Sequence, residues 1–146
     1  MAHLTYSDLS DAINQMHKAD IFNDQNVKEI LTAGTDVMLD NVKTAFVRAG
    51  HNNPGKPRRT GKTLRHFARS RKVRRTKDDV PYMVVTVNGK DERGQRYGTK
   101  AFVLNYGRRR GGRIPADYYL TISARNAWGR VNETMINIMR NKLEGR

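Results

Sequence analysis

The sequence has no cysteine. This excludes disulfide bridges, thiolate zinc sites and thiol nucleophiles together. It also has no apolar run long enough to span a bilayer and no signal-peptide pattern, so we expect a soluble protein made in a cytoplasm, without a membrane partner. At 146 residues with 37% hydrophobic residues, the chain predicts one domain, residues 1–146, with a small core and extensions.

Acidic residues are missing from residues 43–77, which carry thirteen Lys and Arg. The preceding residues 1–42 are net acidic, with seven Asp and Glu against two Lys. A basic segment of this density repels itself unless an anion lies near it, so we expect a phosphate backbone or an acidic protein face as its partner. A solvated loop without a partner remains an equal alternative for this segment considered alone.

Helical periodicity dominates both ends of the chain. Residues 1–22 predict an extension with a short helix, in which Leu4, Leu9, Ile13 and Met16 share a face and Ser7 is the N-cap. A long helix over residues 24–48 should begin at Asn23 or Asp24 and stop at Gly50. A second long helix should run from about Leu120 to Leu143. Its apolar stripe includes Ala127, Trp128, Val131, Met135 and Met139, which we expect to pack in the core.

Between the helices the pattern changes twice. Residues 51–79 predict a basic loop or arm, with a short helix near residues 62–70. Residues 82–87 predict a strand, Asn88-Gly89 a hairpin turn, and residues 96–104 one or two returning strands. The predicted fold class is therefore α+β: a central antiparallel sheet of three to four strands, flanked by the two long helices.

No catalytic, metal or cofactor site is predicted. Gly61-Lys62-Thr63 resembles the end of a phosphate-binding Walker A loop, but Lys56 stands where the pattern requires glycine. The four histidines are scattered, and the carboxylates do not cluster in apolar settings. We expect Tyr118 and Tyr119 to pack at a helix start rather than stack on bases.

The candidate contact residues are basic side chains in the arm and in a second, glycine-rich loop. The second loop should be flexible and could grip phosphates or insert between subunits; both alternatives remain open. No helix-turn-helix, zinc-finger or ribonucleoprotein motif accompanies the charge, so readout of a base sequence is not expected. The candidates are Arg58, Arg59, Lys62, Arg65, Arg69, Arg71, Lys72, Arg74, Arg75, Arg108, Arg109, Arg110 and Arg113.

Three short motifs follow the first long helix in order: Arg-Thr-Gly-Lys-x-Leu at residues 59–64, Ala-x-x-x-x-Tyr-Gly at residues 101–107 and Pro-Ala-x-x-Tyr-Leu at residues 115–120. With the helices, this order resembles the neck or tail-completion proteins of long-tailed bacteriophages. The matching residues are structural: Thr60 and Gly61 at a turn, Gly107 at a strand end, and Ala116 and Leu120 at the start of the last helix. Relatives often carry Glu and Thr where this chain has Asn105 and Arg108.

The resemblance implies a small α+β virion protein, not an enzyme, that forms a homo-oligomeric ring at the head-to-tail joint. Its expected partners are further copies of itself, the head-completion or adaptor protein, and the tail-terminator or tail-tube protein, with DNA contact in the channel left open. It would be made in the host bacterial cytoplasm and located in the virion. The alternative is a small nucleic-acid-binding protein without sequence preference.

Overall fold

A computed structural model describes residues 11, 14, 23–52 and 61–145. The chain forms helices α2 (Asp24–Arg48), α3 (Lys62–Arg65), α4 (Tyr97–Tyr106) and α5 (Tyr119–Glu144), and strands β1 (Phe67–Arg69), β2 (Arg74–Arg75), β3 (Pro81–Tyr82) and β4 (Val85–Val87). The predicted α+β class, with two long helices and antiparallel strands, is confirmed. The N-terminal extension lies outside the described residues apart from Asp11 and Asn14.

The two long helices begin and end close to where the periodicity predicts. Asn23 is the N-cap of α2, and its side chain accepts a hydrogen bond from the Asn26 backbone N–H at 2.9 Å. The helix ends just before Gly50, whose φ of +73° cannot continue it. In α5 the buried residues Ala127, Val131 and Met139 follow the predicted stripe.

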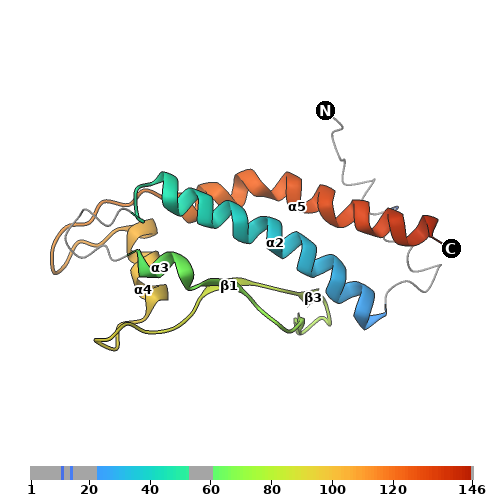
Figure 1. The fold of residues 1–146 in the computed structure, drawn as a ribbon, viewed down its shortest axis with the longest axis horizontal. Coiled ribbons are helices and arrows are strands. Elements are labelled where there is room, and N and C mark those ends of the chain that lie inside the picture. The colour runs from blue at the N-terminus through green and yellow to red at the C-terminus, as the bar shows by residue number, and fades with distance from the viewer. Residues whose placement is uncertain (1–10, 12–13, 15–22, 53–60, 146) are drawn as a thin grey trace.

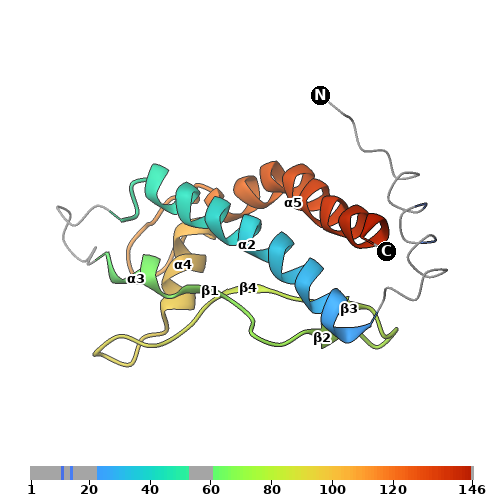
Figure 2. The same ribbon diagram turned by 45° about the vertical axis from the view of Figure 1, so that its right-hand side comes forward.

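The long helices pack against each other in antiparallel directions, with the strands on one side of α2 (Figures 1 and 2). The Lys142 ammonium donates to the Glu29 carboxylate at one end of the pair, and Phe46 packs edge-on to Tyr119 at the other. The sequence predicted that the two helices flank a central sheet, and this arrangement is not found. The helices instead pack directly on each other, because each buries its apolar stripe against the other.

A larger core lies where the C-terminal half of α2 meets the start of α5. Val42, Phe46, Phe67, Ala101 and Tyr119 form it, with Phe46 and Phe67 rings 5.3 Å apart. A smaller cluster joins the other ends of the helices. Gly34 lies between these clusters, where an added Cβ would be 2.7 Å from the Met135 sulfur, so the absence of a side chain permits the close approach of α2 and α5.

The strands form two separate antiparallel pairs rather than one sheet. Strand β1 pairs with β4, placing Phe67 opposite Val87, and β2 pairs with β3, placing Arg74 opposite Tyr82. Among the described residues no single sheet of three to four strands is found. The chain also turns at Asp91, not at Asn88-Gly89: the Asp91 carboxylate accepts the backbone N–H groups of Arg93 and Gln95.

Three further predictions are wrong. Residues 96–104, predicted as one or two returning strands, lie almost entirely in helix α4, whose buried residues Tyr97, Ala101 and Asn105 recur every four positions. Gly107 therefore ends a helix and not a strand. Trp128 was placed on the buried stripe of the last helix but is 61% exposed, because Ala127 and Val131 occupy the face toward α2.

Candidate interaction surfaces

The described part of the predicted basic arm is folded onto the protein through three ion pairs. Lys62 pairs with Glu92 at 2.6 Å, Arg69 with Asp36 at 2.6 Å, and Arg75 with Asp24 at 3.1 Å. The hydrogen bond and charge of Glu92 raise the pKa of Lys62. These pairs are largely exposed, so each contributes little to the stability of the fold. They position the segment on the protein but leave the charge of its other basic side chains without an ion pair.

Lys77 and four of the predicted contact residues of the segment are exposed and form no ion pair with the described residues. The four predicted contact residues are Arg65, Arg71, Lys72 and Arg74. Arg71 and Lys72 lie in the connection between β1 and β2, and Arg74 lies in β2 itself. These four form what we call the arm cations. Arg58, Arg59 and Thr60 lie outside the described residues.

Gly61, at the beginning of α3, has a φ of +67° and is its N-cap. A Cβ there would be 3.3 Å from the Asn52 side-chain oxygen. The turn before α3 therefore uses a backbone conformation that favours glycine.

The second predicted basic cluster forms a closed loop between α4 and α5. Arg108 pairs with Ile114 as an isolated antiparallel bridge, with backbone hydrogen bonds in both directions at 2.8 and 2.9 Å. The Arg108 guanidinium also donates to the carbonyls of Gly111 and Gly112. Arg108 is thus used to close the loop, whereas Arg109, Arg110 and Arg113 are exposed and have no ion pair within the described residues.

Beside this loop lies an exposed apolar surface that the sequence did not reveal. Phe102 and Tyr106 are one turn apart on α4, and Tyr118 and Ile122 are one turn apart at the start of α5. Their rings contact each other: Phe102 stacks on Tyr106 with centroids 6.1 Å apart, and Tyr106 meets Tyr118 edge-on at 6.5 Å. All four side chains are more than half exposed. We call them the aromatic patch.

The sequence prediction that Tyr118 and Tyr119 both pack is therefore half wrong. Tyr119 is buried and its hydroxyl donates to the Ala101 carbonyl at 3.2 Å. Burial, with a smaller contribution from the Asp117 charge, raises the pKa of Tyr119. Tyr118 instead points outward, with a φ of +54°. The only sequence signal for the patch was the i, i+4 spacing of Phe102 and Tyr106, once residues 97–106 are read as a helix.

Asn105 fixes the patch by joining α4 to α5. Its side chain is fully buried, and its oxygen accepts the backbone N–H of Leu120 at 2.8 Å and of Thr121 at 3.4 Å. These are first-turn donors of α5 that the helix itself cannot satisfy. The Asn105 carbonyl also accepts the Tyr118 N–H at 3.0 Å. Asn105, which departs from the resembled pattern, is therefore a capping residue from a neighbouring helix.

Gly107 and Ala116 complete the same junction. Gly107 has φ +78° and ψ 178°, and a Cβ there would be 2.7 Å from the Ile114 carbonyl oxygen and 2.8 Å from the Ala116 nitrogen. The backbone of residues 114–116 therefore passes directly over Gly107. At the end of α2, His51 is buried against the Phe46 and Tyr119 rings and contacts the Asp117 carboxylate through Nε2 at 2.5 Å.

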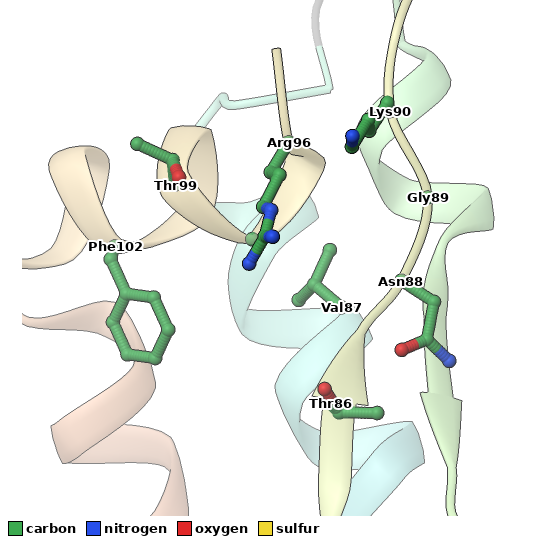
Figure 3. Close-up of a pocket in the computed structure, with 9 residues that line it drawn as sticks. Thr86, Val87, Asn88, Gly89, Lys90, Arg96, Thr99 and Phe102 are labelled. Carbon is green, nitrogen blue, oxygen red and sulfur yellow. The ribbon is translucent and has the colours of Figure 1, made fainter. Parts of the chain in front are cut away.

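An open pocket of about 530 Å³ lies between the first turns of α4 and strand β4, and Phe102 of the aromatic patch is part of its lining (Figure 3). Arg96 points toward its centre, and Lys90, Phe102 and Thr86 are among the residues that line it. Neither Lys90 nor Arg96 has an ion pair among residues 23–52 and 61–145. The pocket is therefore a third region of uncompensated positive charge.

Within the described residues, no group of three or more His, Asp or Glu side chains is placed to hold a metal ion. No helix in this part of the chain is long and apolar enough to cross a membrane. Comparison of the chain with protein-family models, curated proteins and solved structures gave no match.

Proposed function

We propose that this protein is a structural virion protein of a tailed bacteriophage, which forms a ring at the head-to-tail joint and connects the capsid portal or adaptor to the tail. The observation that carries the proposal is the exposed aromatic patch, whose two helices are joined by a loop that carries three exposed arginines without ion pairs among the described residues. Exposed aromatic clusters with adjacent Arg are typical of protein interfaces. The order of the three motifs between the long helices supports the same assignment.

The two basic regions have separate roles in this proposal. The arm cations dock on an acidic face of a neighbouring ring, such as the head-completion protein or the tail terminator. Their exposed side chains, none of which belongs to a core cluster, are accessible to such a partner. The loop of residues 108–113 either lines the channel through which DNA passes or contacts a neighbouring subunit. The protein performs no catalysis.

A second candidate function is supported by the unpaired cations on all three surfaces: non-sequence-specific binding to nucleic acid. In that case the basic side chains neutralise phosphates and release counterions. The logarithm of the binding constant then falls with the logarithm of salt concentration with a slope of about −0.9 per phosphate contact on duplex DNA. The aromatic patch has no necessary role in such binding.

Light scattering coupled to size exclusion separates the two functions. The purified protein is measured at low and moderate salt, with and without duplex DNA, over a range of protein concentrations. A discrete oligomer, formed without DNA, is the result expected for the joint protein. A monomer that coats DNA and dissociates as salt rises would overturn that function and favour the nucleic-acid binder.

A further inference from the structure

The hairpin that joins β4 to α4 places two positive charges directly opposite each other. Lys90 and Arg96 form an isolated antiparallel bridge. The Tyr97 N–H donates to the Gly89 carbonyl beside this bridge, so Lys90 and Arg96 are a non-hydrogen-bonded pair, whose side chains lie close together on one face. Like charges in this position destabilise a hairpin. We call Lys90 and Arg96 the hairpin cations.

The acidic side chains of the hairpin do not compensate this charge. Asp91 follows the first cation in the chain, but its carboxylate accepts a hydrogen bond from Lys100. The next carboxylate, that of Glu92, pairs with Lys62. Within residues 23–52 and 61–145 the hairpin cations therefore have no counter-ion. A bound anion would relieve their repulsion and is the ligand that such a pair favours.

Further hydrogen-bond donors line the pocket of about 530 Å³ into which Arg96 points (Figure 3). Thr86 and Thr99 supply hydroxyl groups, and Asn88 supplies an amide. None of the described Asp and Glu residues lines this pocket. A phosphate group has more acceptor oxygens than a carboxylate and carries up to two negative charges, so it uses this set of donors more fully.

The same pocket has an aromatic wall. Phe102 lines it and is 56% exposed, and the Tyr106 ring stacks on Phe102 with an angle of 8° between the ring planes. Exposed aromatic rings of this kind bind nucleobases by stacking, with little preference between bases. The volume also lies within the range of small-ligand sites, about 300–1,000 Å³. Phosphate donors and a stacking surface together fit a nucleotide.

Close packing at the base of the hairpin holds the pocket in place without a ligand. Tyr97 is buried and its ring stacks on His66, with centroids 3.9 Å apart. A Cβ at Gly89 would be 2.9 Å from the His66 Nδ1, and a Cβ at Gly98 would be 3.2 Å from the Val87 carbonyl oxygen. The hairpin and α4 are therefore fixed against β4, which reduces the cost of ordering the site when a ligand binds.

We infer that this pocket binds a nucleotide, with its phosphate between the hairpin cations and its base against Phe102. The nucleotide is either free or a unit of a single-stranded nucleic acid, because the bases of a duplex are stacked on each other and are not presented to Phe102. The inference goes beyond the proposed ring and does not depend on it. It also differs from binding through the sum of the surface cations, since one pocket carries it.

Fluorescence anisotropy of a short, labelled oligothymidylate tests the site on the full chain. Lys90→Gln with Arg96→Gln should weaken binding by about tenfold or more, through the loss of charged hydrogen bonds. The slope of log affinity against log salt should become shallower by about 0.7, the value for one phosphate contact on a single strand. The matched control, Arg71→Gln with Lys72→Gln, removes the same charge from the arm and should keep the affinity near that of wild type.

A second pair of variants tests the base contact. Phe102→Ala should weaken the strand about fivefold or more, as expected for losing one stacked base. Ile122→Ala is the control, because Ile122 is an equally exposed member of the aromatic patch that does not line the pocket. A duplex of the same length should bind more weakly than the strand, and Phe102→Ala should not change its affinity.

Unlabelled thymidine 5′-monophosphate separates the two sources of the nucleotide. Displacement of the strand by the monophosphate from wild type supports a site for a free nucleotide. Binding of the strand that requires the hairpin cations and Phe102 but resists the monophosphate supports a site for a single strand.

Three results would overturn the inference and leave the proposed ring untouched, because the ring is tested by mass without DNA. The first is an equal loss of affinity in the hairpin and arm double variants, which would indicate diffuse binding through surface charge. The second is a Phe102→Ala protein that binds the strand as wild type does. The third is a wild-type protein that binds neither the strand nor the monophosphate at low salt.

Discussion

Replacing Gly107 with alanine should destabilise the fold strongly through two separate effects. At φ +78° and ψ 178° the backbone occupies a region that is almost restricted to glycine, and a side chain there costs about 1–3 kcal/mol. The new Cβ would also lie 2.7 Å from the Ile114 oxygen and 2.8 Å from the Ala116 nitrogen. Both are backbone atoms, which cannot rotate away, and overpacking of this kind costs about 1–3 kcal/mol.

Together these effects predict a loss of roughly 2–6 kcal/mol, a large part of the ~5–15 kcal/mol that stabilises a typical domain. The free energy of unfolding is measured by urea titration, with far-UV circular dichroism as the signal. The variants are compared with wild type at the same denaturant slope m. Gly94→Ala is the matched control: its φ is +76°, but nothing lies within 4 Å of the added Cβ. It should lose only about 1–2 kcal/mol, the cost of the left-handed backbone alone.

A third variant sets the baseline. Gly129 lies within α5, and its added Cβ meets nothing within 4 Å, so Gly129→Ala should stabilise the protein by about 0.5–1 kcal/mol. If Gly107→Ala loses no more stability than Gly94→Ala, the crossing of residues 114–116 over Gly107 is wrong. The junction between α4 and α5 would then need to be redrawn, together with the position of the aromatic patch.

Other residues give independent predictions. Asn105→Ala should cost about 1–3 kcal/mol by leaving first-turn N–H groups of α5 without an acceptor, and Asn105→Asp should recover part of this in urea unfolding; equal losses would show that the oxygen is not the cap. Arg71→Glu, Lys72→Glu and Arg74→Glu together should leave thermal unfolding within a few degrees of wild type yet block head-to-tail joining in an assembly assay; normal joining would refute docking by the arm cations. Hydrogen bonds from Lys100 and from the Gln95 and Arg93 backbone lower the pKa of Asp91 from 3.8, so its stabilising effect is complete above pH 3.8 and lost as pH falls through the lowered value. Asp91→Asn should therefore flatten the acid limb of the stability profile, and an unchanged limb would contradict the turn described for Asp91.

The long helices were predictable because their signals are local. Asn23 caps α2 and Gly50 follows its end, and the apolar spacing of Val27, Ile30, Val42 and Phe46 gives the buried face directly. Helix α4 was missed for a physical reason. Its aromatic and β-branched residues Tyr97, Phe102 and Val103 suggest a strand, but Tyr97 is buried in the helix and Phe102 faces solvent. Sequence propensity does not distinguish these cases, since tertiary packing decides them.

The candidate surfaces were predictable only where they are contiguous in the sequence. The arm and the loop of residues 108–113 were visible as charge clusters, although their ion pairs with Asp24, Asp36 and Glu92 depend on elements distant in the chain. The aromatic patch was not predictable, because it exists only when Asn105 brings the end of α4 against the start of α5. No local sequence pattern indicates that the end of α4 and the start of α5 lie together.

The ladder of β2 and β3 has a dynamic consequence. Each strand is two residues long, and none of its residues belongs to either core cluster. The exposed Arg75–Asp24 ion pair, which joins the ladder to α2, weakens as salt rises. Backbone amides of this ladder should therefore exchange with solvent hydrogen far faster than those of the helix pair, through local opening that leaves the core intact. Arg71, Lys72 and Arg74 of the arm cations can consequently change direction to meet a partner surface without unfolding the protein that carries them.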